Sequence, residues 1–319
     1  MESKTILVTG VAGFIGSQVT DKFLEKGNHV IGLDNFNDFY SPELKRKNIS
    51  HLLSNSKFEL VEADIRKPRI FDTLFRKYDV DSVVHLAARA GVRPSLENPQ
   101  LYWDVNVMGS LNLLESMKLN KIEQLVFASS SSVYGNRTNG PFKETDNTDH
   151  QISPYGATKK ALEVMAATYA SLYKIHTTGL RFFTVYGPRN RPQMACSNFI
   201  EALETNSTIT KYGDGSTGRD YTYIDDICSG IVAATDKALK YEIINLGNSS
   251  PVLLNELIET LATVTGKKPK INQKPIQPGD VEFTFADISK AKKLLGWSPN
   301  TSLKDGLTKT VKWYRDIHQ

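Results

Sequence analysis

The stretch Thr5-Ile6-Leu7-Val8-Thr9-Gly10-Val11-Ala12-Gly13-Phe14-Ile15-Gly16 decides the fold of this chain. Its first five residues form a short β-branched and apolar run, which predicts a buried strand of a parallel sheet. The glycines then recur as GxxGxxG, and residues 17–26 read as a helix closed by Gly27. This order predicts a dinucleotide site, because glycines let the backbone approach a pyrophosphate and the helix N-terminus offers free N–H groups.

A second strand follows and ends in an acidic residue. Residues 28–34 read as a turn and a strand, with Asp34 as the last residue. A carboxylate at this place accepts the ribose hydroxyls of adenosine and would repel a 2′-phosphate, so NAD is favoured over NADP. The alternative is that Asp34 merely ends a strand.

Three further strand-like runs extend the pattern, at residues 58–65, 81–88 and 124–135, the last of which runs into a cluster of hydroxyl side chains. Helical segments are expected at residues 70–77 and 99–120. This alternation predicts the α/β class, with a doubly wound parallel Rossmann sheet. Ligands bind such sheets at the carboxyl ends of the strands, and the candidate residues fall at or beyond those ends: Gly13, Asp34, Ala87, Ser130 and Tyr155.

Tyr155 and Lys159 stand four residues apart in a predicted helix that begins at Ser153-Pro154, a helix-start signal. This spacing places the ammonium near the phenol oxygen. The cation would favour the phenolate, and lowering the pKa of Tyr155 by about 3 units corresponds to about 4 kcal/mol. Tyr155 is therefore a candidate base, although the same pair also occurs on ordinary solvated helices.

The composition is that of an ordinary globular protein of 319 residues with a net charge of +4. Scattered Lys and Arg argue against nucleic acid or a membrane surface as the main partner. Cys196 and Cys228 predict small buried thiols rather than a disulfide framework, and we expect no metal site. Residues 1–4 run directly into the first strand, and no long apolar run occurs, so we expect a cytoplasmic enzyme or binding protein.

Together, the three glycines, Ser130 and Tyr155-x-x-x-Lys159 resemble the extended short-chain dehydrogenases/reductases, over essentially the whole chain. Later blocks narrow this resemblance to nucleotide-sugar epimerases, dehydratases and decarboxylases: residues 180–188, 223–226, 278–280 and 295–299. The resemblance implies a nucleotide-diphosphate sugar as substrate. It also implies that tightly held NAD takes a hydride from C4 of the sugar.

Ser131 and Ser132 bear on the chemistry after that oxidation. Dehydratases of this group resemble each other in carrying Asp-Glu before Val-Tyr-Gly, and the decarboxylases carry Ser-Glu. No carboxylate stands at this place here to act as a general acid or base. The resemblance therefore implies C4 epimerisation through a transient 4-keto intermediate, without net redox change.

The sugar is suggested by residues 177–192 and 90–93, which resemble the UDP-glucuronate 4-epimerases more than the galactose-type enzymes. The implied reaction converts UDP-glucuronate to UDP-galacturonate. Arg191, with Thr184, is assigned to the C5 carboxylate, because an Arg fork matches a carboxylate in two hydrogen bonds. Arg191 could instead contact a pyrophosphate or lie at the surface, and Arg89 and Arg189 are weaker candidates. A UDP-glucose 4-epimerase, a UDP-glucuronate decarboxylase and a catalytically silent NAD-binding sensor are the competing functions.

The resemblance implies three sets of site residues. The catalytic set is Tyr155, Lys159 and Ser130. The cofactor set is Gly10, Gly13, Phe14, Ile15, Gly16, Asp34, Asn35, Asp64, Ile65, Ala87, Ala88, Asn106, Tyr155 and Lys159. The substrate set is Arg93, Ser130, Ser131, Thr184, Arg191, Arg219 and Asp280.

Two unequal lobes are expected. An NAD-binding domain would cover residues 1–185 with a returning segment at about 223–247. A smaller α/β substrate lobe would cover residues 186–319, as about 186–222 and 248–319. In that lobe, residues 209–212 and the turn at 213–215 suggest a small strand pair. The helices near 99–119 and 154–174 resemble the pair that builds a homodimer through a four-helix bundle in this family.

Overall fold

A computed structural model describes residues 3–137, 140–275 and 283–318 of the chain. Its main feature is a seven-stranded sheet in the order β10-β6-β5-β4-β1-β2-β3, in which all neighbours are parallel. The strands are β1 (Thr5–Thr9), β2 (His29–Asp34), β3 (Phe58–Glu62), β4 (Ser82–His85), β5 (Gln124–Ser130), β6 (His176–Phe182) and β10 (Tyr241–Leu246). The predicted parallel Rossmann sheet is confirmed.

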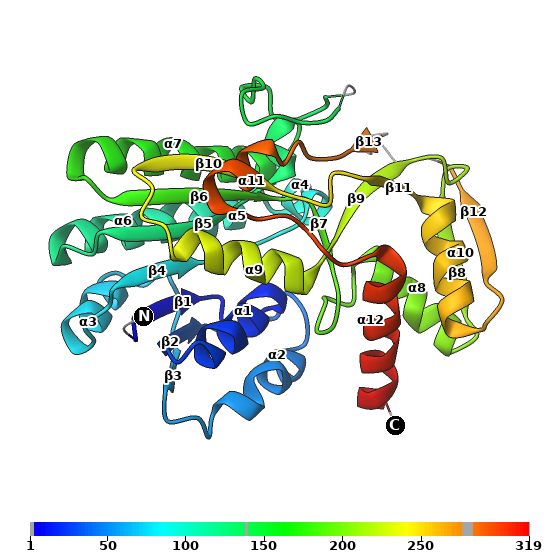
Figure 1. Cartoon of the computed structure of the whole chain (residues 1–319), viewed down its shortest axis with the longest axis horizontal. Coiled ribbons are helices and arrows are strands. Elements are labelled where there is room, and N and C mark those ends of the chain that lie inside the picture. Colours follow the sequence, from blue (N-terminus) through cyan, green and yellow to red (C-terminus); the bar gives the residue numbers. More distant parts are fainter. Residues whose placement is uncertain (1–2, 138–139, 276–282, 319) are drawn as a thin grey trace.

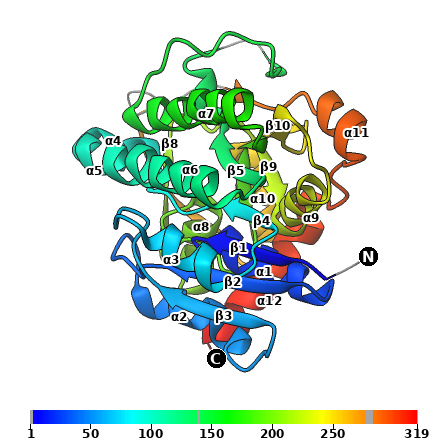
Figure 2. The ribbon, with the colours of Figure 1, turned by 90° about the vertical axis from the view of Figure 1, so that its left-hand side faces the viewer.

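Helices cover both faces of this sheet, which explains why its central strands β1, β4 and β5 are buried almost throughout. Side chains alternate between the faces of a strand: Leu7 packs into the cluster on one face, while Ile6 and Val8 pack into the cluster on the other. Figure 2 shows α6 and α7 on one side and α1 and α9 on the other. The bounds of these four helices are α1 (Phe14–Glu25), α6 (Gly109–Asn120), α7 (Pro154–Tyr173) and α9 (Ile224–Thr235). Two shorter helices in the same part of the chain are α2 (Pro42–Ile49) and α3 (Ile70–Lys77).

The segment predicted as one helix over residues 99–120 is helical throughout but contains a π turn. After α4 (Val92–Glu97), the chain forms α5 (Pro99–Trp103), a π-helical turn at Asp104–Met108, and then α6. A π turn inserts a residue and re-aims the side chains around it. Sequence periodicity does not reveal such a turn, because tertiary contacts decide it.

A second group of elements lies to the right in Figure 1. A small sheet has β9 (Gly218–Tyr223) paired with β7 (Thr184–Tyr186), β11 (Pro251–Leu253) and β13 (Phe283–Thr284). Beside it pack α8 (Ala195–Glu204), α10 (Leu254–Thr265) and α12 (Leu303–His318), whereas α11 (Ser289–Leu295) lies beside β10. Residues 209–212 are predicted to form a strand pair with the turn at 213–215. They do lie in a strand, β8 (Thr208–Tyr212), but its partner is the distant β12 (Lys270–Lys274), and the two strands are parallel.

The chain crosses between the two sheets more than once. β7 contains the expected boundary at 185/186 and belongs to the small sheet, whereas α9 packs on α1 and β10 is an edge strand of the large sheet. The two-lobe division stays a proposal that fits this sheet membership. Within the residues described here, no helix is both long and apolar enough to cross a membrane.

Candidate active site

A pocket lies at the carboxyl ends of β1 to β6, where an open parallel sheet binds its ligands. It brings together most of the residues that the sequence singles out. These are Gly10, Gly13, Phe14, Ile15, Gly16, Asp34, Asn35, Asp64, Ile65, Ala87, Ala88, Ser130, Ser131, Tyr155, Lys159, Thr184 and Arg191.

The glycine turn forms one wall of the pocket. Gly10 adopts a φ of +71°, a region that favours glycine, and its N–H donates to the Leu33 carbonyl at 2.7 Å. A Cβ on Gly16 would lie 2.0 Å from the Gly10 carbonyl oxygen, so the turn tolerates no side chain there. Helix α1 has no side-chain cap, so its first N–H groups remain available to an anion in the pocket. This cradle fits a dinucleotide pyrophosphate.

Two carboxylates line the pocket on the side of the glycine turn. Asp34 accepts from the Ala12 N–H at 3.0 Å and the Phe36 N–H at 2.9 Å. Burial raises the pKa of Asp34, and these backbone bonds oppose the rise. Asp64 accepts from Arg66 and from Asn35, and the Arg66 guanidinium lowers the pKa of Asp64 to about 2. Both side chains are held in place to accept ligand hydroxyls or amines.

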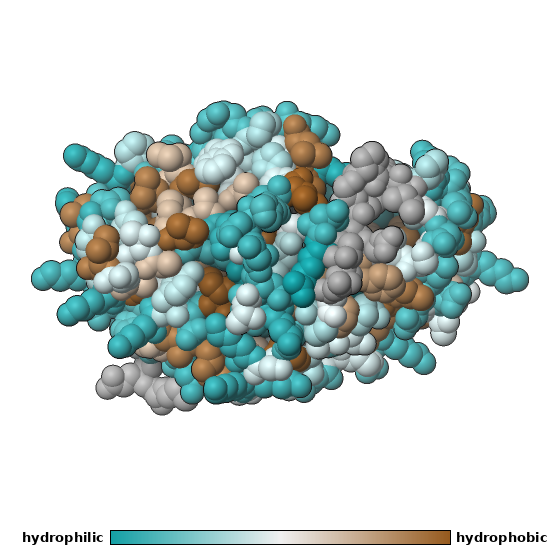
Figure 3. Space-filling model, turned by 90° about the horizontal axis from the view of Figure 1, so that it is seen from above, coloured by the Kyte–Doolittle hydropathy of each residue, from teal (hydrophilic) through white to brown (hydrophobic). Residues whose placement is uncertain are grey.

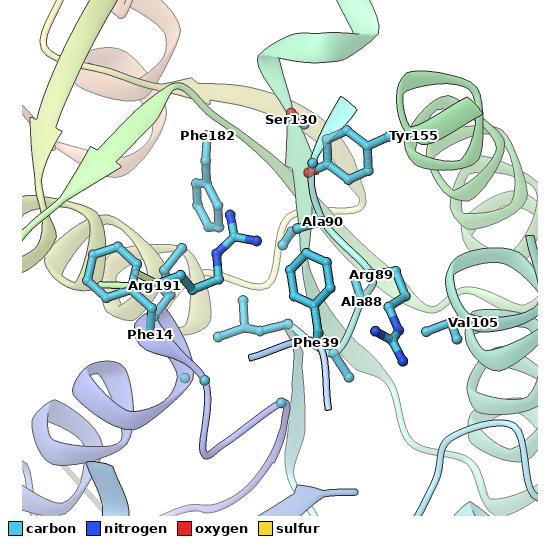
Figure 4. A pocket seen from close by; sticks show the side chains of 18 of the residues that line it. Phe14, Phe39, Ala88, Arg89, Ala90, Val105, Ser130, Tyr155, Phe182 and Arg191 are labelled. Carbon is cyan, nitrogen blue, oxygen red and sulfur yellow. The ribbon is translucent and has the colours of Figure 1, made fainter. Parts of the chain in front are cut away.

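The catalytic candidates meet where α7 begins. The Ser153 side chain caps α7 by accepting the Gly156 N–H at 3.1 Å, as the sequence predicts. Tyr155 points toward Ser130 (Figure 4), whose oxygen accepts the Ser132 N–H at 3.1 Å. The Lys159 ammonium is buried and donates to the Ala128 carbonyl at 2.8 Å. The end of β5 therefore holds both side chains of the pair.

The protein's own groups do not by themselves lower the pKa of Tyr155. Burial raises the pKa of Tyr155, while the Ser130 hydrogen bond and the charge of Arg191 lower it, and burial prevails. Lys159 turns toward the Ala128 carbonyl and is not among these influences. The helical spacing alone could not reveal this, because the direction of the shift depends on desolvation by the whole fold.

The pKa of Lys159 is also shifted from its ordinary value. Burial lowers the pKa of Lys159 to about 8. A neutral or easily neutralised ammonium is uncommon in a folded protein, and strongly shifted groups in pockets favour a functional role. Lys159 is thus a second indication that this end of the pocket handles protons.

The pocket offers few groups for acid–base chemistry besides this pair. Among the described lining residues, Asp34 and Asp64 are the only carboxylates, and both are engaged as given above. The place next to Ser130 is occupied by the hydroxyls of Ser131 and Ser132, which begin a 3-10 helix at Ser131–Tyr134. Elimination or decarboxylation assisted by a carboxylate there has no group to carry it.

Arg191 projects into the middle of the pocket, toward the space below Ser130 and Tyr155 (Figure 4). Its guanidinium carbon lies 5.5 Å from the ring centre of Phe39, and Arg89 lies at the same distance from that ring. Within the described residues, Arg191 has no carboxylate partner, and its Nη2 donates only to the Met194 sulfur at 3.4 Å. An arginine held this way can bind an anionic ligand.

Three of the described residues that the sequence predicts for the site are not on the pocket wall. Asn106 is buried in the π turn, where its side chain bonds both backbone groups of Arg89 and the Thr158 hydroxyl. It supports the wall rather than lining it. Arg93 stacks over Tyr212 at 5.6 Å, and Arg219 lies on β9; neither lines this pocket. Asp280 lies outside the described residues.

Sequence reasoning missed part of the wall. The pocket also includes Asn37, Phe39, Tyr40, Lys45 and Asn190. The first four lie in residues 37–45, and the polar and basic composition of residues 38–54 predicts only a loop and a helix there. The adjacent aromatics Phe39 and Tyr40, five and six residues after Asp34, were the available signal, because large apolar side chains in a polar loop need a surface to cover. The predicted buried thiols are confirmed, since Cys196 and Cys228 are both free and buried.

Fold and pocket together define a nucleotide-binding α/β enzyme of the extended short-chain dehydrogenase/reductase type. A family model described as GDP-mannose 4,6 dehydratase matches residues 7–310, and the chain belongs to this family of nucleotide-sugar enzymes.

Individual relatives are similar over nearly the whole chain. A UDP-glucuronate 4-epimerase of Thermodesulfobacterium geofontis (strain OPF15) is 46% identical over 311 residues, covering 97% of this chain and 96% of that protein. UDP-glucuronate 4-epimerase 4 of Arabidopsis thaliana is 45% identical over 328 residues, covering 97% of this chain and 75% of that protein.

Among solved structures, UDP-glucuronic acid 4-epimerase from Bacillus cereus in complex with UDP-glucuronic acid and NAD has a TM-score of 0.93 and 39% identity, covering 98% and 99% of the two chains. UDP-glucose 4-epimerase from Thermotoga maritima with UDP-glucose has a TM-score of 0.92 and 34% identity, covering 99% and 100%.

Proposed function

We propose that this protein is an NAD-dependent UDP-glucuronate 4-epimerase, which interconverts UDP-glucuronate and UDP-galacturonate through a 4-keto intermediate. The observation that carries the proposal is a single pocket with a glycine turn at one end and Tyr155, Ser130 and an unpaired Arg191 at the other. The epimerases from T. geofontis and B. cereus support it.

The residues of the pocket fit NAD. The turn at Gly10–Gly16 would hold the pyrophosphate on the N-terminus of α1, and Asp34 would accept the adenosine ribose hydroxyls. Lys159 would donate to the nicotinamide ribose hydroxyls. The chemistry that bound NAD supplies is reversible acceptance of a hydride from C4 of the sugar.

Tyr155 is the proposed base. It takes the O4 proton as the hydride leaves C4 and returns the proton after the keto sugar has turned over in the pocket. Ser130 hydrogen-bonds O4 in both orientations. On this chain, Ser130 and Arg191 are the groups that favour the phenolate against burial. Among the described lining residues, the carboxylates of Asp34 and Asp64 are engaged in bonds of their own, and Lys159 donates to the Ala128 carbonyl.

Arg191, with Thr184, is the proposed binding site of the C5 carboxylate. A 4-keto uronic acid is a β-keto acid, which loses carbon dioxide most readily when the breaking bond is perpendicular to the carbonyl plane. Two hydrogen bonds from Arg191 would hold the carboxylate nearer to that plane and suppress the loss. The absence of a carboxylate beside Ser130 among the described lining residues agrees with epimerisation rather than decarboxylation.

Product analysis tests the proposal. The protein is incubated with UDP-glucuronate and no added reductant, and the products are separated and identified. We expect UDP-galacturonate to form until equilibrium, with Tyr155→Phe essentially inactive. A mixture without UDP-galacturonate would refute the function, and faster conversion of UDP-glucose would favour the neutral-sugar alternative.

A cytoplasmic homodimer is also proposed. Apolar side chains are exposed on the helices that would form the four-helix interface: Trp103, Met108, Val164, Leu172 and Tyr173. Figure 3 shows apolar patches on the half of the surface that includes α7. Pairing these faces between two copies would remove that surface from water. The molar mass in solution, from light scattering, tests it.

A further inference from the structure

Two buried polar groups in the pocket wall have no partner. Within the described residues, the Tyr40 hydroxyl and the Asn190 side-chain nitrogen Nδ2 make no hydrogen bond. The two residues are only 8% and 9% exposed, and both line the pocket. Nearly all buried polar groups in folded proteins are hydrogen-bonded, because their desolvation is otherwise not offset. Two such donors in one pocket point to a ligand that accepts from both.

Tyr40 lies on the loop that leaves β2, six residues after Asp34. Its ring packs on the Lys45 ammonium, 4.8 Å from the ring centre, and Lys45 donates to the Asn37 carbonyl at 2.6 Å. Burial raises the pKa of Tyr40, and both Asp34 and Arg191 are near enough to influence it in opposite directions. Tyr40 thus shares the pocket wall with both Asp34 and Arg191.

Asn190 lies on the loop that follows β7. Its Oδ1 accepts the Arg191 N–H at 2.8 Å, which fixes the amide and leaves Nδ2 as the free donor. The Pro188 carbonyl two residues earlier accepts from the Gln18 side chain of α1 at 2.8 Å. Because Gln18 is the fifth residue of α1, this bond ties the Asn190 loop to the first turns of that helix.

Three sets of groups that can donate thus line one pocket: the N–H groups at the start of α1, the Tyr40 hydroxyl and the Asn190 amide. Acceptor atoms of a ligand would suit all three, since backbone and amide N–H groups only donate and the Tyr40 hydroxyl can donate. Donors of this kind suit a diphosphate, whose nonbridging oxygens are all acceptors and carry negative charge. The same pocket is lined by Asp34 and the glycine turn, and the Gln18–Pro188 bond holds the Asn190 loop against the helix whose N-terminus would bind the diphosphate.

We infer that Tyr40 and Asn190 bind the dinucleotide diphosphate together with the glycine turn and so help to retain the cofactor. This inference rests on the proposed function for its choice of NAD. The other diphosphate that could enter the pocket belongs to the nucleotide sugar, and the experiment separates the two.

The test measures binding of ADP-ribose and of UDP to the full chain freed of cofactor, by titration calorimetry. ADP-ribose carries the dinucleotide diphosphate without the nicotinamide, and UDP carries that of the sugar donor. Tyr40→Phe and Asn190→Asp are each expected to weaken ADP-ribose binding about tenfold or more, with the affinity for UDP unchanged. Tyr78→Phe is the matched control, because that hydroxyl bonds Glu59 on the surface.

Thermal unfolding without ligand provides a second readout. Tyr40→Phe removes an unsatisfied buried hydroxyl, so its midpoint should equal or exceed that of the parent, although it binds ADP-ribose more weakly. Unchanged ADP-ribose affinity in both variants would overturn the inference, as would weaker UDP binding in place of ADP-ribose binding. Because the test measures binding and not turnover, its result can be interpreted even if the epimerase assay fails.

Discussion

Glu163 is predicted to fix the catalytic helix to the sheet through a buried ion pair. It stands on α7, four residues after Lys159 and eight after Tyr155. Its carboxylate accepts from Arg181 Nε and Nη2, both at 2.8 Å, and from the Ser129 hydroxyl at 2.6 Å. The side chains of Glu163 and Arg181 are 2% and 3% exposed, so water cannot replace either partner.

The loss of stability expected when one partner is removed follows from that burial. Removing one partner of a buried pair leaves an uncompensated charge and costs about 3–5 kcal/mol, a large share of the roughly 5–15 kcal/mol that stabilise a typical protein. Replacing both partners by apolar side chains of similar volume is often nearly neutral. Glu163→Met and Arg181→Met should therefore each be strongly destabilising, and the double variant clearly less so than their sum.

Urea unfolding, followed by circular dichroism, measures the three variants. The exposed pair Arg46–Glu62, whose atoms lie 3.0 Å apart, is the control, and Arg46→Met should cost less than about 1 kcal/mol. Additive effects of Glu163→Met and Arg181→Met, to within about 0.5 kcal/mol, would refute the coupling. So would a Glu163→Met variant as stable as the parent.

Three further outcomes are expected. Arg191→Ala should release more carbon dioxide and UDP-pentose per UDP-galacturonate formed, and an unchanged product ratio would count against its proposed role. Gly16→Ala should lower the free energy of unfolding in urea by about 1–3 kcal/mol, because its Cβ would meet the Gly10 carbonyl at 2.0 Å; Gly13→Ala, at 3.1 Å, should be milder. Lys159 has a folded pKa of about 8, below its ordinary 10.5, so the unfolded chain binds more protons between these values. Stability without ligand should therefore rise from pH 8 to 10.5, by up to about 3 kcal/mol, and Lys159→Met should abolish the rise in a urea series across that range.

The sequence by itself determined the features that depend on neighbouring residues. The strand before Gly10 and the helix after Gly13 follow from local apolar patterning and from glycines that a turn requires. The i, i+4 spacing of Tyr155 and Lys159 puts both on one face of any helix. The alternation of strands and helices fixes the parallel sheet, and a parallel sheet binds ligands at its carboxyl edge.

Only the tertiary structure decided which distant side chains share the pocket and what burial does to them. Tyr40 and Asn190 come from loops 150 residues apart, and no local pattern brings them together. Asn106 leaves the wall because a π turn directs its amide to Arg89 and Thr158. The pKa of Tyr155 rises rather than falls, because desolvation is set by everything packed around the ring and not by the lysine one turn away.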